Sequence, residues 1–467
     1  MASILDQFGK PFAVQRTRTE LVRAKFDAAQ STDENTRHWS YTDSLAADAS
    51  ASYSVRKTLR ERARYEIANN SYAKGIVLSL ANDTIGRGPR LQSQFEDTRT
   101  NDLIEAEFAR WAQAIRLARK LRTMRMARCV DGESFGLFVS NSRLGTPVQL
   151  DLRLIEADQV HTTDMTLQEN AVDGIRYDEN GTPTEYHVLR AHPGTDTWAI
   201  VDAMEYDAWD AEEVVHLYRL DRPDLHRGIP EITPALPLFA QLRRYTLAVI
   251  AAAETAASFA AVLYTDSPAI DPDDVEPLDY IDLDRRQAMT LPMGWKLGQT
   301  KAEQPTTTYG EFKQELLDEI LRCLLMPHNV GVGNSADYNY ASGRLDHQTY
   351  HKAISIDRSE IETECLDRIF FHWLREARRI PDYLPPIPDT VPHEWFWDGF
   401  AHVDPVKEAT AKQILLAANL TTLAHEYAQE GRDWEQAIRQ RGRELQAMRE
   451  AGLKLAEEQS NAETDDE

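Results

Sequence analysis

The residues from Gly343 to about Arg379 carry the feature that constrains this chain most, a helical pattern that continues for about 37 residues. At 1.5 Å per residue, such a helix extends over about 55 Å. Its apolar residues recur on one stripe, which a helix buries against a core. That stripe contains Ile354, Ile361, Cys365, Ile369, Trp373 and Ala377, flanked by Leu366, Phe370 and Leu374. With 467 residues, the chain is long enough for two to four structural units.

The composition is that of soluble globular proteins, with 42% apolar and 27% charged residues. The most apolar window, Leu247 to Leu263, is interrupted by Glu254, Thr255 and Ser258, so no membrane span is expected. The first twenty residues lack the apolar core and cleavage site of a signal peptide.

The three cysteines are far apart in the chain and show no metal-ligand spacing: Cys129, Cys323 and Cys365. This pattern is typical of a reducing compartment and of a protein without a disulfide framework.

The net charge of −24 argues against tight nucleic-acid binding by the free subunit. Proteins that hold nucleic acid usually carry a basic surface, because lysine and arginine neutralise phosphates. The charge does not exclude a protein through which nucleic acid passes without being held.

The first part of the chain reads as a loosely ordered arm followed by helices. A helix is predicted from Val55 to about Thr84, with a break at Asn69-Asn70, and a helical pair from about Thr100 to Val130. The stretch from Arg110 to Arg128 carries seven basic residues. A solvated helix face paired with nearby acids explains them better than a nucleic-acid patch.

From Glu133 to Tyr218 the apolar period changes to two, which is typical of strands. "SFGLFV" and "LDLRLI" read as strands, and "GIRYDENGTPTEYHVL" reads as a hairpin that turns at Asn180-Gly181. A β-rich unit after helices predicts an α+β fold.

A Pro-rich stretch then leads into an Ala-rich helix, about Pro234 to Leu263, whose small side chains allow close packing against a neighbour. The following segment, Thr265 to Asp284, contains eight acidic and no basic residues. A disordered linker and a small, structured acidic insertion both fit it. The strand-like "AMTLPMGWKLG" that follows favours the insertion.

Helix is predicted again from about Thr307 to Met326, and a loop from His328 to Ser342 precedes the long helix. Two C-terminal helices are expected, the first beginning at Asp404-Pro405. Asp433 and Gln436 resemble a capping box for the second.

His347 and His351 lie one helical turn apart, the spacing of a zinc-binding helix. In zinc proteases a glutamate follows the first histidine and acts as the general base. Here that position is Gln348, which cannot accept a proton, and no third ligand is identifiable.

"GVGNS", Gly331 to Ser335, is too short for a nucleotide-binding loop and lacks the lysine of such loops. No cofactor, metal ion or catalytic residue is therefore expected.

Several blocks, taken in order, resemble one family, the portal (head–tail connector) proteins of tailed bacteriophages, lambda-type branch. These blocks are "RERARYEIANNSYAKGIVLSLANDTIGRGPRLQ", "VDGESFGLF", "GIRYDENGTPTEYHVL", "VVHLYRLDRPDLHRGIPEITPAL", "LLMPHNVGVGNSADYNYASGR" and "DPVKEATAKQILLAANLTTLAHEYAQEGRDWEQ". Together they cover most of residues 55 to 440.

The resemblance implies a non-enzymatic ring of about twelve subunits at one capsid vertex of the virion, assembled in the host cytoplasm. Double-stranded DNA passes through such a ring during packaging and ejection. The implied partners are the terminase large subunit, the major capsid or scaffold protein and a head–tail connector or adaptor protein, with no membrane.

The resemblance also implies an architecture: a mixed α/β wing, a two-helix stem, a small α/β clip, a tunnel loop with a long helix after it, and a helical, crown-like C-terminus. The corresponding ranges are an N-terminal arm at 1–54, wing 55–230, first stem helix 231–263, clip 264–305, second stem helix 306–327, tunnel loop 328–342, long helix and return to the wing 343–400, C-terminal helices 401–455, and a disordered acidic tail 456–467.

Three groups of candidate site residues follow from this assignment. The DNA-facing residues of the tunnel loop are Asn334, Ser335, Asp337, Tyr338, Asn339, Tyr340, Arg344 and Lys352. The acidic clip residues that dock the motor or connector are Asp271, Asp273, Asp274, Glu276, Asp279, Asp282 and Asp284. The small residues that pack the stem are Ala252, Ala253, Ala256 and Ala257.

Two hypotheses of different class remain at this point. The first is a DNA conduit that assembles into a ring, and the second is a soluble metal-dependent hydrolase that uses His347 and His351. A net acidic subunit suits a conduit, because each lysine or arginine contact to phosphate strengthens binding and would retard the DNA.

Overall fold

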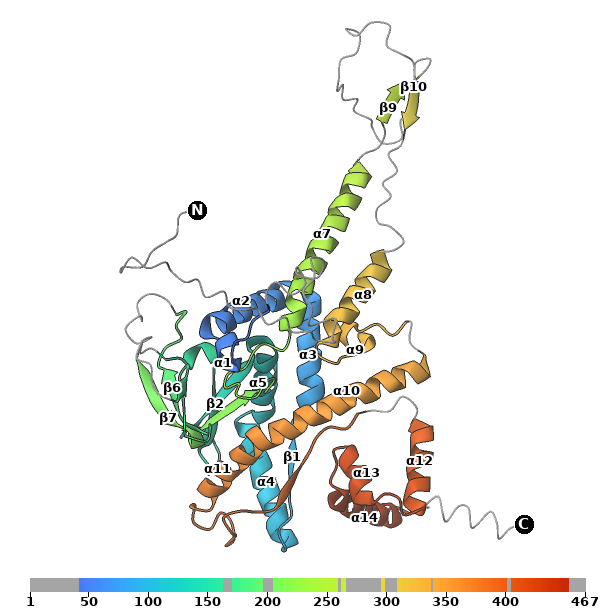
Figure 1. Ribbon diagram of the computed structural model, residues 1–467. Helices are drawn as coiled ribbons and strands as arrows, with labels where there is room; N and C mark the ends of the chain where they lie inside the picture. The colour runs from blue at the N-terminus through green and yellow to red at the C-terminus, as the bar shows by residue number, and fades with distance from the viewer. Residues whose placement is uncertain are drawn as a thin grey trace, which may run out of the picture. The chain divides into compact units, whose positions relative to one another are not determined.

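A computed structural model describes residues 42–162, 170–195, 205–258, 262–265, 295–298, 309–336, 339–400 and 405–452 (Figure 1). The chain divides into a short N-terminal unit, Met1–Ala46, and a large unit, Ala47–Glu467. All elements below belong to the large unit. The fold combines helices with several small sheets, which confirms the predicted α+β class.

The large unit begins with helices α1 (Ala47–Ser50), α2 (Tyr53–Asn69) and α3 (Ser71–Ile85). The predicted break lies where expected: Asn70 is extended, and its side chain accepts hydrogen bonds from the first N–H groups of α3. The arm predicted up to residue 54 is shorter, because Ala47 and Ala51 are buried against Leu225.

The predicted helical pair is confirmed as α4 (Thr98–Ala114) and α5 (Leu117–Asp131). Between α3 and α4, β1 (Arg90–Ser93) pairs antiparallel with β11 (His393–Phe396), which comes from the far end of the chain.

Two antiparallel sheets follow. In the first, β2 (Glu133–Ser140) lies between β3 (Leu150–Ile155) and β8 (Val214–Tyr218). The second has the order β4 (Ala171–Val172), β5 (Ile175–Tyr177), β6 (Pro183–Leu189) and β7 (Tyr206–Asp210). The predicted turn is present between β5 and β6, where Gly181 has φ +80°.

The Ala-rich helix is α7 (Leu236–Ser258), and it ends earlier than predicted. Val262–Thr265 forms β9, which pairs antiparallel with β10 (Trp295–Gly298). The prediction that helix continues to residue 263 is therefore wrong, because β-branched and aromatic residues pair as strands there.

The next helix, α8 (Tyr309–Arg322), also ends before the predicted Met326. Leu325 adopts a left-handed conformation (φ +53°), and the Met326 N–H bonds back to the Leu321 carbonyl at 3.2 Å. This closing turn follows the common way in which helices end.

The long helix is present as three consecutive parts: α10 (Tyr340–Ile361), a π-helical turn over Glu362–Leu366, and α11 (Asp367–Ala377). Its predicted apolar stripe is buried. The predicted loop before it is shorter, since a short helix, α9 (His328–Val332), occupies its beginning and Asn339 caps α10.

The described residues of the C-terminal region form three helices where two were predicted: α12 (Pro405–Ala417), α13 (Leu423–Gln429) and α14 (Trp434–Glu450). Asp433 caps α14 as predicted. The capping box is not reciprocal, because the Gln436 amide donates to Glu105 on α4 instead.

Among the described residues, the buried apolar side chains form three large clusters. One joins α4, α5 and α11, a second joins α2, α3, α7, α8 and α10, and a third lies between the two sheets. Among the described helices, none is both long and apolar enough to cross a membrane.

Candidate functional site

The site is the connection between α8 and α10, which contains the predicted tunnel loop. Its first part is held tightly: a Cβ added to Gly331 on α9 would lie 2.1 Å from Leu321 Cδ2 on α8. His328 Nδ1 and Asp318 Oδ1 are 2.5 Å apart across the same two helices. Helix α9 therefore packs closely on α8, and any larger residue at position 331 would require the Leu321 side chain to move.

The loop itself runs from Gly333, which ends α9 with φ +74°, to Asn339. Asn334 and Ser335 are exposed, and the Ala336 N–H donates to Asn334 Oδ1 at 3.1 Å. Asn339 accepts from the Ser342 N–H at 2.9 Å and thereby begins α10. The described part of this loop is thus short, polar and solvent-facing.

The predicted site residues Asp337 and Tyr338 lie outside the described residues. Tyr340 lies in the first turn of α10.

The two histidines have structural partners. Asn329 Nδ2 donates to His347 Nε2 at 2.8 Å, which joins α9 to α10 beneath the loop. The His351 ring stacks on Phe400 with ring centroids 3.7 Å apart. His347 therefore links α10 to α9, whereas His351 packs α10 against the segment that contains Phe400.

Helix α10 is anchored on α3 by polar contacts. The Tyr350 hydroxyl donates to Asp83 Oδ2 at 2.8 Å. Arg358 donates to the backbone carbonyls of Asp83 and Thr84, both at 2.9 Å. Burial raises the pKa of Asp83, although the Tyr350 hydrogen bond opposes this shift. The loop consequently starts and ends on supported helices.

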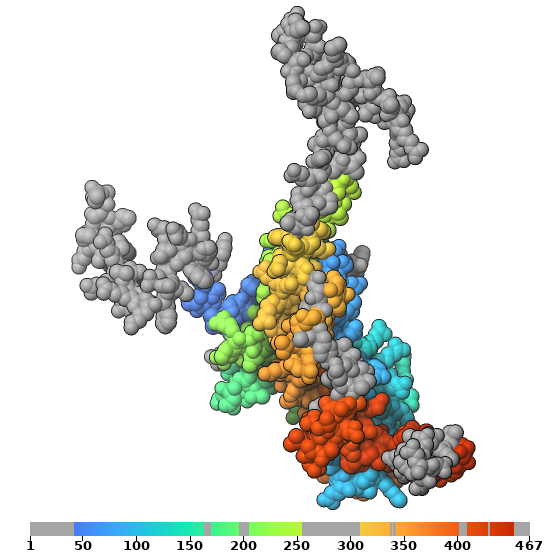
Figure 2. All heavy atoms as spheres, turned by 90° about the vertical axis from the view of Figure 1, so that its right-hand side faces the viewer, coloured from blue at the N-terminus to red at the C-terminus, as the bar shows by residue number. Residues whose placement is uncertain are grey.

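The outer side of α10 is exposed. Arg344 and Lys352 lie there beside the apolar Leu345 and Ile356, which are 66% and 54% exposed. Neither cation has a carboxylate partner among the residues that the structure describes. Figure 2 shows α10 (orange) on the face below α8 (yellow) and above the C-terminal helices (red).

Among the described residues, no cluster of three or more potential metal ligands includes His347 or His351, which the hydrolase hypothesis would need. Within the described ranges, the group able to hold a metal ion consists of Glu156, Asp158 and His192. Guanidinium groups already contact its carboxylates: Arg60 lies 2.6 Å from Asp158, and Arg64 lies 2.9 Å from it. These positive charges oppose a cation there.

Elsewhere in the described chain, buried charged side chains form networks around Glu133 and around Glu231. The first surrounds Glu133, which is fully buried at the start of β2. Arg227 contacts it at 2.7 and 2.8 Å, Arg56 and Arg60 each at 3.3 Å, and His216 at 3.2 Å. Burial would raise the pKa of Glu133, but the Arg227 charge and the hydrogen bonds from His216 and Arg227 hold it well below its usual value.

Two further carboxylates balance this network. Asp158 pairs with Arg60, and Asp173 pairs with both Arg56 and Arg227. Three arginines and three carboxylates thus connect α2, both sheets and the segment before α7.

Next to this network, the backbone segments that contain Gly132 and Gly228 lie very close to each other. A Cβ added to Gly228 would lie 2.1 Å from the Gly132 carbonyl oxygen, and one added to Gly132 would lie 2.7 Å from the Gly228 oxygen. Only glycine fits at either position.

The second network surrounds Glu231, which precedes α7. Arg125 and Arg128 on α5 contact Glu231 at 2.8 and 2.9 Å. The same arginines reach α10, where Asp357 lies 2.6 Å from Arg125 and Glu360 lies 2.9 Å from Arg128. The prediction of a solvated basic face on this helix is therefore wrong for Arg125 and Arg128, which are buried.

A protein-family model matches most of this chain. Residues 32–358 match the model of the family described as phage portal protein, lambda family. The chain belongs to this family.

Among curated proteins, this portal-family chain is similar to a probable portal protein of Halomonas phage phiHAP-1. The two are 24% identical over 442 residues, which cover 86% of this chain and 82% of the relative.

Among solved structures, similarity is found to chains from gene transfer agent (GTA) particles. A chain from the neck of an empty GTA particle, solved with C6 symmetry, has 13% identity and a TM-score of 0.47, and the match covers 83% of this chain and 99% of that one. A chain from the neck of a native GTA particle, solved with C12 symmetry, has 12% identity and a TM-score of 0.45, with 81% and 93% covered.

The sequence blocks that carry the portal resemblance meet in the first buried network. Arg60 lies in the first block, Glu133 in "VDGESFGLF", and His216 and Arg227 in the block before α7. Sequence reasoning missed this. The sequence did contain a sign of it: Arg56 and Arg60 lie on the same face of the helix as Ala63, so these two arginines occupy positions that the helix buries.

The remaining portal predictions fall partly outside the described residues. All seven clip acids do so: Asp271, Asp273, Asp274, Glu276, Asp279, Asp282 and Asp284.

Of the four alanines predicted to pack the stem, Ala252 and Ala253 are half-buried on α7. The side chains of Ala256 and Ala257 lie outside the described residues. Aromatic rings contribute to the contact between α7 and α8: the Tyr245 ring centroid lies 5.5 Å from that of Tyr309 and 5.0 Å from that of Phe312.

Proposed function

We propose that this chain assembles into a ring of about twelve subunits whose central channel carries double-stranded DNA into and out of a phage capsid. The family match over residues 32–358 carries the proposal. In this role the protein is a structural component of the virion at one capsid vertex, assembled in the host cytoplasm, and not an enzyme.

The geometry of the described part of the loop supports a DNA-contact role for Asn334, Ser335 and Asn339. A short loop between two supported helices can present small polar side chains to DNA without moving the scaffold. Arg344 and Lys352, which lack carboxylate partners among the described residues, can provide local positive charge beside phosphate. Few such contacts keep the binding weak, as translocation requires.

The parts of the ring follow from the same assignment. The α+β region forms the wing, α7 and α8 form the stem, and the segment around β9 and β10 forms the clip. The clip acids would dock the terminase large subunit and later the connector or adaptor protein, and the wing and C-terminal helices would face the capsid or scaffold protein.

The experiment replaces residues 334–338 with two glycines. Rings should still form, because α9 and α10 keep their contacts with α8 and α3, and DNA packaging or retention should fall. The matched control replaces 142–146, in the largely exposed loop between β2 and β3, in the same way. Loss of ring assembly in the first variant alone would contradict the proposal, since it would make the loop a structural element.

A further inference from the structure

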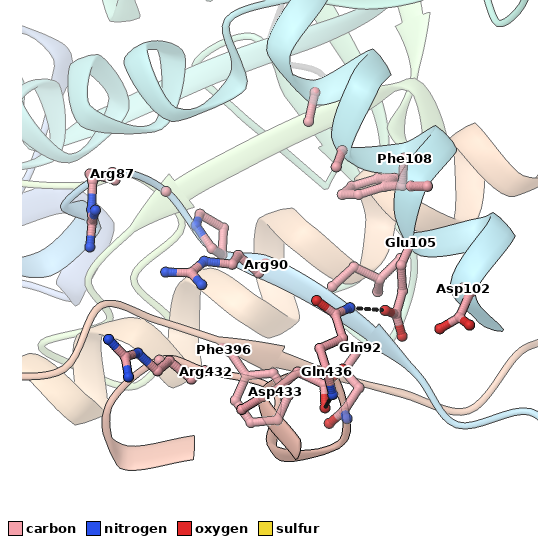
Figure 3. Close-up of a pocket in the computed structure, with 18 of the residues that line it drawn as sticks. Arg87, Arg90, Gln92, Asp102, Glu105, Phe108, Phe396, Arg432, Asp433 and Gln436 are labelled. Atoms are coloured by element: carbon pink, nitrogen blue, oxygen red, sulfur yellow. Dashed lines mark hydrogen bonds between the residues drawn. The ribbon is translucent and has the colours of Figure 1, made fainter. Parts of the chain in front are cut away.

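A large groove of about 1610 Å³ lies between the C-terminal helices and the segment formed by α4, β1 and the start of α5 (Figure 3). Its floor includes Phe108 and Leu91, which belong to the core, and Phe396 on β11. On one side of the groove, α14 is held to α4 by a hydrogen bond of 3.2 Å, which Gln436 donates to Glu105. No residue predicted to face the channel lines it.

The groove is strongly basic although the chain carries a net charge of −24. Eight arginines line it: Arg87, Arg90, Arg116, Arg119, Arg432, Arg439, Arg441 and Arg443. Four carboxylates line it: Asp102, Glu105, Asp433 and Glu444. Burial raises the pKa of Glu105 to about 7, so it carries only part of its charge near neutral pH.

Some of these arginines are already neutralised. Arg87 and Arg90 share Asp398 at 3.2 and 3.4 Å, and Arg439 lies 2.8 Å from Asp102.

Three others are exposed and have no carboxylate partner among the described residues: Arg116, Arg119 and Arg443. They come from the α4–α5 turn, from α5 and from α14, so unpaired guanidinium groups line both sides of the groove. Such groups bind phosphate strongly.

We propose that this groove binds the sugar–phosphate backbone of double-stranded DNA, without sequence preference, at a site separate from the channel. Protein partners are usually anchored by exposed aromatic or large aliphatic side chains. None of the exposed large apolar residues of the described chain lines this groove. Spaced guanidinium groups without apolar anchors fit a ligand that repeats phosphates along its length.

The test uses the full-length protein and a covalently closed circular duplex, which has no end to thread through a closed ring. Binding is measured by fluorescence anisotropy from about 25 to about 200 mM NaCl. The groove variant is Arg119→Gln with Arg443→Gln, and the matched control is Arg62→Gln with Arg449→Gln, exposed arginines that do not line the groove.

We expect the slope of log affinity against log salt to become shallower by about 2 in the groove variant, one unit for each lost phosphate contact, and to stay unchanged in the control. Equal losses in both variants, or no binding by the natural protein at the lowest salt, would overturn the proposal.

Residues 453–467 carry six acids and one lysine and are the competing occupant. If DNA bound only after their removal, the groove would belong to the acidic tail, and the proposal would again be overturned. Mass photometry of the same samples keeps the two proposals apart: rings with an unchanged salt slope refute only the groove, whereas absence of rings refutes the conduit.

Discussion

Replacing Glu133 with glutamine tests the buried network on which the family's sequence blocks meet. Glu133 is the carboxylate that three arginines share, and it has no exposure to solvent. Glutamine keeps the shape but removes the charge, and its amide group would face guanidinium donors. The three arginines would then share two carboxylates, Asp158 and Asp173.

Breaking a buried ion network by removing one partner leaves an uncompensated charge in the interior, which costs about 3–5 kcal/mol. We therefore expect the free energy of unfolding to fall by about that amount at pH 7. The folded-state pKa of Glu133 is lowered, so its contribution is fully present above the usual value of 4.5. The difference between variant and natural protein should thus shrink only below that pH, as the pH approaches the lowered value.

The assay is urea unfolding of the unassembled subunit, followed by circular dichroism at pH 7 and pH 4. The control is Glu360→Gln in the second network, where the glutamate side chain is 43% exposed and the expected loss is below about 1 kcal/mol. A loss for Glu133→Gln no larger than the control's would refute the reasoning.

Two further predictions concern other parts of the fold. Burial raises the pKa of Glu105 to about 7, so the natural protein loses stability as the pH rises from 4.5 through 7. In thermal unfolding, Glu105→Gln should therefore be more stable than the natural protein by about 1 kcal/mol at pH 8, after allowance for solvent screening. At pH 4 the two proteins should have nearly the same stability. Gly228→Ala should destabilise by more than about 2 kcal/mol, because its Cβ would meet the Gly132 carbonyl, whereas Gly145→Ala, with open space around it, should be nearly neutral in the same urea titration.

Local patterns predicted most of the elements because their causes are local. Asn70 caps a helix with its own side chain, and the turn at Gly181 needs only a glycine with positive φ. The buried stripe of the long helix follows from its 3.6-residue period.

The predictions failed where longer-range pairing decides the conformation. Helix was expected up to residue 263, but Val262–Thr265 pairs with Trp295–Gly298, and the sequence of either segment alone does not reveal the other. The loop was expected from 328, but α9 forms there because Gly331 allows it to pack on α8.

The candidate site was only partly predictable for the same reason. The sequence pointed to the loop and to both histidines. It did not reveal that His347 would bond to Asn329 and His351 would stack on Phe400, because these contacts depend on how the helices pack. The networks around Glu133 and Glu231 likewise join residues that are far apart in the chain.

The proposed ring is tested most directly by negative-stain electron microscopy of the purified protein, viewed along the symmetry axis, with mass photometry of the same sample. We expect a closed ring of about twelve subunits around an open channel. A monomer or dimer that carries stoichiometric zinc would contradict it.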